Sequence, residues 1–137
     1  KMSVFQAERA VSQLAARYGL SIRSYCIGQL SWEAPVCYGA AFGLEAPEGA
    51  GDEAEERRTA GRLDRALMAQ NPDYLDLRRL GCLGRPQVLC LSPEEYTAFQ
   101  EELGMTGGHG KPRHAAGAVP EPVWKKWKEI SSGRRKE

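Results

Sequence analysis

The chain has 137 residues, of which 42% are hydrophobic and 27% charged, and its formal net charge at pH 7 is +1. These values are typical of one globular domain with a single hydrophobic core, and they exclude a multidomain enzyme. No apolar run approaches the roughly 20 residues of a membrane span. The amphipathic N-terminal stretch also lacks the apolar centre of a signal peptide. We therefore expect a soluble, cytoplasmic chain without a membrane partner, or a segment cut from a longer protein.

A helix and a β-hairpin are the first elements that the sequence predicts. Apolar residues recur at three-to-four spacing over residues 4–18, and Gly19 follows at the position of a C-terminal cap, which predicts a helix. Residues 20–30 and 35–45 are predicted strands joined by a short turn, because alternate residues of the second one are apolar.

A second helix and a third strand follow. The acidic start and apolar spacing of residues 53–70 predict a helix, which Asn71 and Pro72 should end. A short helical piece is expected over residues 73–81. The apolar run of residues 86–91 predicts a buried strand.

The clearest local signal in the sequence predicts a helix over residues 93–103. Ser92 is suited to the N-cap, Pro93 to the first helical position and Glu95 to a capping box, and Gly104 stands at the end. The element order is thus helix, strand, strand, helix, strand, helix. This order predicts an α+β fold, in which a single mixed β-sheet is covered by helices.

The end of the chain is basic. Residues 109–137 contain eight of the 19 Lys and Arg residues and three of the 18 Asp and Glu residues, a net charge of +5, which leaves 11 against 15, or −4, for residues 1–108. We divide the chain into a folded domain of residues 1–104, a glycine-rich loop of residues 105–118, and a basic tail of residues 119–137. The tail has a possible short helix within it.

Four cysteines lie in apolar or strand-like stretches. They never approach the C-x-x-C spacing of zinc sites, so we predict reduced thiols packed in the core rather than metal ligands or disulfides. These residues are Cys26, Cys37, Cys82 and Cys90.

The stretch GGHGKPR, residues 107–113, raises the question of a phosphate-binding loop. A Walker A motif requires G-x-x-x-x-G-K-[ST] between a strand and a helix, but Met105 stands at the first glycine position and Pro112 follows Lys111. A self-contained phosphate loop is therefore excluded. A lysine on a mobile glycine-rich loop can still carry its charge to a phosphate or carboxylate held by another surface. The alternative is a solvated lysine without a role.

A series of short motifs runs without gaps through the middle of the chain. They are L-D-x-x-L, N-P-x-Y, an arginine-bearing segment and G-x-L-G-x-P, followed by a strand and a helix. Together they resemble the C-terminal domain of the Gretchen Hagen family of acyl acid amido synthetases, in the adenylate-forming superfamily. The matching residues are Leu63, Asp64, Leu67, Asn71, Pro72, Tyr74, Arg78, Gly81, Leu83, Gly84 and Pro86.

Both ends of the matching region carry further likeness. The opening KMS resembles the end of the family's G-E-K-x-[S/T] hinge between its large adenylating domain and its small C-terminal domain. GGHGKPR is similar to the family's loop G-Q-x-K-x-P-R. His109 replaces the glutamine, one residue is missing between Lys111 and Pro112, and the tail has no counterpart. The resemblance covers most of residues 1–113.

The resemblance implies an enzyme that adenylates a carboxylic acid with ATP and Mg, then joins the acyl group to an amino acid. It implies that residues 1–104 are the small domain of such a ligase. Lys111 would be the catalytic lysine that reaches ATP or the acyl-adenylate, and Lys111 and Arg113 would bind the cofactor. The partner would be an N-terminal adenylating domain. The chain alone is then expected to be inactive, with neither cofactor nor metal bound.

Two other functions stay open on the sequence alone. The chain could be a free-standing interaction module that binds an acidic partner through its basic tail, or a family relative that has lost activity. Nucleic-acid binding is disfavoured, because the strands lack the exposed aromatic pattern of an RNA-binding sheet.

Several residues have a structural and a functional interpretation, and the structural one is favoured for each. Asn71, Pro72 and Tyr74 suit a helix stop and an aromatic anchor better than a ligand site. Arg78 and Arg79 suit solvated helix positions better than contacts to a carboxylate or nucleotide.

The histidines and tryptophans near the C-terminus are interpreted in the same way. His109 and His114 lack a nearby carboxylate or cysteine and predict neither a general base nor a metal site. The stripe formed by Trp124, Trp127 and Ile130 is predicted to lay its indoles on the domain and leave the lysines around it in water, rather than bind an acidic surface.

Overall fold

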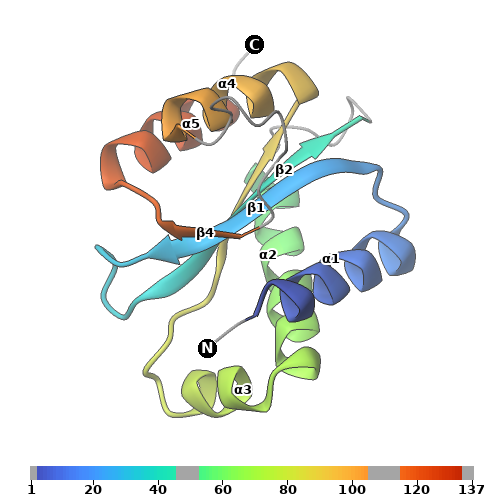
Figure 1. Ribbon diagram of the computed structural model, residues 1–137, viewed down its shortest axis with the longest axis vertical. Helices are drawn as coiled ribbons and strands as arrows, with labels where there is room; N and C mark the ends of the chain where they lie inside the picture. Colours follow the sequence, from blue (N-terminus) through green and yellow to red (C-terminus); the bar gives the residue numbers. More distant parts are fainter. Residues whose placement is uncertain (1–2, 46–52, 105–114, 134–137) are drawn as a thin grey trace.

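The computed structural model describes residues 3–45, 53–104 and 115–133, and within these ranges it forms one sheet flanked by helices (Figure 1). The predicted α+β class and element order are confirmed, and the three main helices have the predicted bounds. In chain order the elements are α1 (Val4–Tyr18), β1 (Ile22–Leu30), β2 (Cys37–Leu44), α2 (Glu53–Gln70), α3 (Pro72–Arg79), β3 (Gln87–Leu91), α4 (Pro93–Leu103), β4 (Ala115–Ala118) and α5 (Glu121–Gly133).

The sheet is mixed and has the strand order β3-β2-β1-β4. The hairpin β1-β2 forms its antiparallel centre, with Tyr25 opposite Phe42. Each outer strand is parallel to its neighbour: β3 pairs with β2, and β4 pairs with β1, where Ala115 lies opposite Ile27. The sequence did not predict β4, which lies within the residues assigned to the glycine-rich loop.

Helices cover both faces of the sheet. The helices α1 and α2 lie on one face, and α4 and α5 lie on the other (Figure 1). Each face has its own hydrophobic cluster, so the single core expected from chain length was wrong for the described residues. Because β2 is apolar at consecutive positions, it supplies side chains to both clusters.

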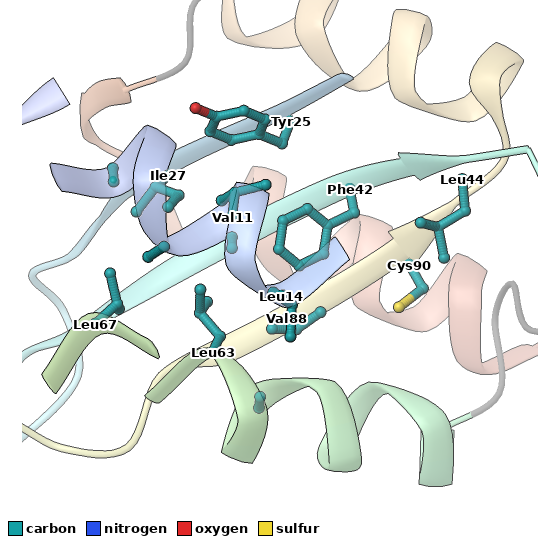
Figure 2. Close-up of a cluster of buried hydrophobic side chains, with 14 of the residues drawn as sticks. Val11, Leu14, Tyr25, Ile27, Phe42, Leu44, Leu63, Leu67, Val88 and Cys90 are labelled. Carbon is teal, nitrogen blue, oxygen red and sulfur yellow. The ribbon is translucent and has the colours of Figure 1, made fainter. Parts of the chain in front are cut away.

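Successive side chains of a strand point to opposite faces of the sheet, so neighbouring strand residues belong to different clusters. Figure 2 shows the cluster beneath α1 and α2, where Phe42 and Ile27 meet Leu14 and Leu63. The cluster on the opposite face is built around Phe99 and the tryptophans of α5.

Capping residues explain where the helices begin and end. Ser3 and Gln6 form a capping box before α1, and Gly19 ends that helix with φ 66° and ψ 33°. Ser92 and Glu95 form the predicted box at α4. Each Ser side chain accepts a backbone N–H that would otherwise lack a partner in the first helical turn.

Three of the four cysteines are buried, as the sequence predicted, but Cys82 is exposed in the turn after α3. The prediction of a core position was therefore wrong for Cys82. All four are free thiols. Burial raises the pKa of Cys26 to about 12 and that of Cys37 to about 11, so both stay protonated near neutral pH.

Candidate functional site

The candidate site is the segment of residues 105–114, which contains Lys111 and Arg113. This segment, with His109 and His114, lies outside the described residues. The structure does describe the elements at its two ends, α4 before it and β4 after it. What these elements contact determines how the segment is held on the domain.

Helix α4 holds the near end of the segment. Tyr96 and Phe99 are buried against the sheet, so the helix is fixed along its length. It ends at Gly104, whose φ of 73° and ψ of 23° are left-handed. The N–H of Gly104 donates to the carbonyl of Glu101 at 3.0 Å. Glycine reaches this conformation without steric cost, which ends the helix at a defined residue.

Strand β4 and the residue after it hold the far end. The backbone of β4 pairs with β1, and the N–H of Val119 donates to the carbonyl of Gln29 at 2.8 Å. The indole N–H of Trp32, in the β1-β2 turn, donates to the carbonyl of Val119, also at 2.8 Å. The chain that leaves the segment is thus fixed to the centre of the sheet.

Helix α5 secures this arrangement through two tryptophans. Trp124 and Trp127 are 1% and 6% exposed, and both rings meet Phe99 edge-on, with centroids 6.4 and 6.2 Å apart. The indole N–H of Trp124 donates to Gln87 Oε1 at 2.9 Å. The predicted packing of both indoles on the domain is confirmed, so the first part of the tail belongs to the fold.

Glu102 links α4 directly to α5, three residues before the segment begins. Its Oε1 accepts from Lys126 Nζ at 3.0 Å and from the indole N–H of Trp127 at 2.7 Å. The hydrogen bond from Lys126, followed by that from Trp127, lowers the pKa of Glu102. The helix before the segment and the helix after β4 therefore form one unit.

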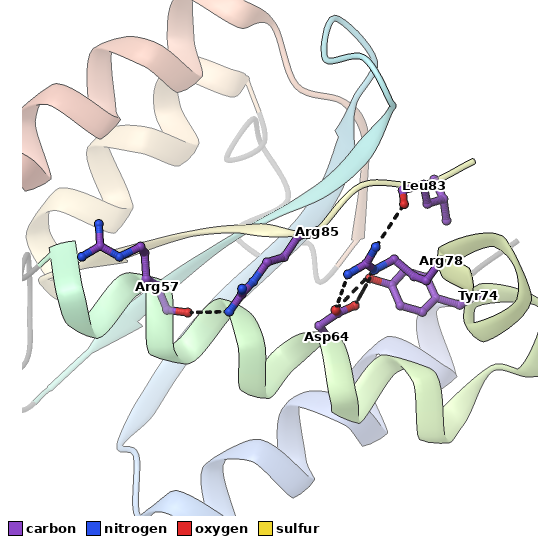
Figure 3. Close-up of polar contacts among 6 residues, drawn as sticks. All are labelled: Arg57, Asp64, Tyr74, Arg78, Leu83 and Arg85. Atoms are coloured by element: carbon purple, nitrogen blue, oxygen red, sulfur yellow. Dashed lines mark hydrogen bonds and ion pairs between the residues drawn. The ribbon is translucent and has the colours of Figure 1, made fainter. Parts of the chain in front are cut away.

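A second polar group connects α2, α3 and the turn that follows α3 (Figure 3). Asp64 Oδ1 accepts from the Tyr74 hydroxyl at 2.7 Å and from Arg78 Nε at 3.0 Å, while Oδ2 accepts from Arg78 Nη2 at 2.8 Å. Arg78 Nη1 donates to the carbonyl of Leu83 at 3.2 Å. We call Asp64, Tyr74 and Arg78 the clamp.

The clamp corrects one prediction and confirms another. Arg78 is not a solvated helix residue, because its guanidinium bonds to Asp64 and to the carbonyl of Leu83; Arg79 is exposed as predicted. Asn71 caps α3 by accepting the Tyr74 N–H at 2.9 Å. Burial raises the pKa of Tyr74, and its bond to Asp64 adds to the shift. Both Asp64 oxygens accept hydrogen bonds from α3, so the clamp ties α2 to α3.

A cationic pocket that the sequence analysis missed lies between α2, the start of β3, and α5. It has a volume of about 240 Å³, and Arg57, Arg85 and Lys128 line it together with buried Glu56. Arg85 lies along α2 and reaches the carbonyl of Arg57 (Figure 3). A Cβ at Gly61 would come within 2.6 Å of Arg85 Nη2. In the sequence, the glycine inside helix α2 was the one indication that another group packs closely against this helix.

The chemistry of the candidate site residues suits phosphate more than a metal ion. Lysine and arginine bind phosphate oxygens, whereas Mg²⁺ requires oxygen ligands. Within the described ranges, no group of three or more His, Cys, Asp or Glu side chains is placed to hold a metal. In the same ranges, no helix has both the length and the apolar character to cross a bilayer.

Comparison with known families gives one result. The sequence model of the GH3 family C-terminal domain matches residues 5–117. This range runs from α1 through β4 and includes the clamp and the candidate segment with Lys111 and Arg113. The comparison with curated proteins found no match.

Proposed function

Because the chain belongs to the GH3 (Gretchen Hagen) family of acyl acid amido synthetases as its C-terminal domain, we propose that it serves an ATP-dependent acid–amino acid ligase. A C-terminal domain implies an N-terminal partner domain, which would hold most of the nucleotide and the acyl acid. The family match carries this proposal. The chain's own contribution would be the cations of the candidate segment, Lys111 and Arg113.

The proposed reaction has two steps. ATP with Mg supplies the activating group: a carboxylate oxygen bonds to the α-phosphorus and pyrophosphate leaves. An amino acid nitrogen then bonds to the acyl carbon, AMP leaves, and the nitrogen loses a proton. Both steps move negative charge onto phosphate oxygens, where a positioned lysine or arginine stabilises it.

The anchored ends of the candidate segment support this role for Lys111. Gly104 and Ala115 belong to elements that pack together through Glu102, Trp127 and the sheet. When the small domain rotates as a body, both anchors move with it, so the ammonium group would be carried toward or away from the partner domain's ligand. This suits the swinging of a small domain between two half-reactions.

The contacts of α5 argue against the interaction-module alternative. Its two tryptophans are buried in the domain, and two of its lysines already pair with carboxylates, Lys125 with Glu121 and Lys126 with Glu102. An acidic partner would therefore compete with existing ion pairs and find no free aromatic stripe.

We expect Lys111→Ala in the full two-domain enzyme to slow adenylate formation, or its conversion to amide, on the order of 10²–10³-fold, the loss typical when one donor that stabilises developing negative charge is removed. Pyrophosphate exchange measures the first step and amide formation the second. Stability to urea should stay unchanged.

Lys125→Ala is the matched control, since it removes an exposed lysine of the same domain and should leave both rates unchanged. Parental rates in both assays for Lys111→Ala would show that this lysine does not have the proposed role.

A further inference from the structure

A second cationic groove lies on the other side of α2, where α1 and α2 pack together on one face of the sheet (Figure 1). Its volume is about 190 Å³. Small or aliphatic side chains, Leu14, Ala66 and Ala69, leave the space open. Three arginines line it, and we call them with Tyr18 the arginine groove. The arginines are Arg17, Arg62 and Arg65.

Tyr18 is the residue on which the three guanidinium groups converge. The guanidinium carbon of Arg62 lies 4.0 Å from the ring centroid, and that of Arg17 lies 5.9 Å from it. Arg65 lines the same groove beside Tyr18. The side chain of Arg65, followed by the positive charges of Arg17 and Arg62, lowers the pKa of Tyr18 against the opposing effect of partial burial. A lowered phenol pKa reports an excess of positive potential.

The carboxylates near the groove do not balance this charge. Arg62 lies 4.0 Å from Glu55, which also makes a 2.6 Å ion pair with Arg58. Among the described residues, neither Arg17 nor Arg65 has an ion-pair partner. The C-terminus of α1 adds only about half a negative charge. At least two positive charges therefore remain without a balancing anion.

We propose that the arginine groove is a binding site for a multiply charged oxyanion of the phosphate or pyrophosphate class. Guanidinium groups donate paired hydrogen bonds to phosphate oxygens, and two uncompensated charges favour an anion with a charge of at least −2. The Tyr18 hydroxyl adds a donor beside the ring on which Arg62 stacks. The site is separate in sequence from the Lys111 segment and does not depend on the proposed ligase function.

The test uses the 137-residue chain with Lys111→Ala and Arg113→Ala, so that binding at the candidate segment does not contribute. Inorganic pyrophosphate, inorganic phosphate and succinate are titrated in turn, with calorimetry or amide chemical shifts as the readout. We expect saturable binding, strongest for pyrophosphate and weaker at higher salt. Arg65→Gln, at an exposed position, should weaken pyrophosphate binding about tenfold, the effect of one charged hydrogen bond.

Arg23→Gln is the matched control, because Arg23 is exposed and pairs with Glu45 away from the groove. It should leave the affinity unchanged. Arg17→Gln provides a second test at the other helix, and shifts of the Tyr18 ring protons on binding would locate the anion. The proposal is overturned by non-saturable binding, by equal loss in Arg23→Gln and Arg65→Gln, or by tighter binding of succinate than of pyrophosphate.

Discussion

Asp64 is the residue on which three parts of the structure depend. It lies on α2, bonds to two residues of α3, and through Arg78 reaches the carbonyl of Leu83 before β3. Its side chain is 10% exposed and that of Arg78 is 21% exposed, so water screens this pair only in part. Removing one partner leaves the other with an unmatched charge in a partly buried place.

We expect Arg78→Ala to lower the free energy of unfolding by about 2 kcal/mol, the cost of leaving partly buried acceptors without their charged donor. Arg79→Ala is the neighbouring control, and should change it by less than about 0.5 kcal/mol, as expected for an exposed side chain. Urea denaturation measures both. Equal effects of the two substitutions would contradict a special role for Arg78.

The partner of Arg78 is 14 residues away in sequence, which explains why the sequence did not predict it. From the sequence one can see only that Arg78 lies in a predicted helical segment, and not which residue it contacts. Asn71 was easier to predict, because a helix cap is a local property of the residues that follow it. At the candidate site, Lys111 and Arg113 could be singled out by motif alone, and their roles stay predictions.

At the scale of elements, α5 determines how the C-terminal part of the chain is held. Trp124 contributes the largest fully buried side chain of the described residues, and its ring lies between α4 and the sheet. Ile130, on the same helix, is 36% exposed. The energetic contribution of the helix is therefore concentrated in its first two turns.

Trp124→Ala should destabilise the domain by about 3–5 kcal/mol, since it leaves a large cavity and removes a donor to Gln87. We expect Ile130→Ala to cost less than about 1 kcal/mol. Thermal unfolding followed by circular dichroism distinguishes the two. A small loss for Trp124→Ala would mean that α5 detaches at little cost.

The predicted elements were those with local signals, such as the capping box at α4 and the alternation in β2. Strand β4 has no such signal. Its sequence, Ala115 to Ala118, is AAGA, which lacks β-branched residues and alternation. It is a strand because its backbone pairs with β1, far away in sequence.

At the scale of the whole molecule, the folded state keeps several weak acids protonated. Burial raises the pKa of Cys26 and of Tyr25 to about 12 and that of Cys37 to about 11. The unfolded chain would lose these protons nearer the ordinary values of 9.0 for cysteine and 10.0 for tyrosine. Between these limits the folded chain binds more protons than the unfolded chain.

These groups should therefore not change the free energy of unfolding below about pH 8. As pH rises from about 9 toward 11, they should lower it. Each group contributes at most about 1.4 kcal/mol per pH unit within its range. Urea midpoints measured from pH 7 to 11 test this. Cys26→Ala should make the fall less steep, and a flat profile would contradict the burial of these groups.

The parallel pairing of β4 with β1 has a consequence for the order in which the chain is made. Ile27 leaves the ribosome long before its partner Ala115, so the hairpin and its first helices can assemble while one sheet edge is still open. The segment with Lys111 acquires its second anchor only when β4 and α5 have been synthesised and have docked. A nascent or prematurely ended chain thus lacks the far anchor of the candidate site, so this part of the domain is completed last.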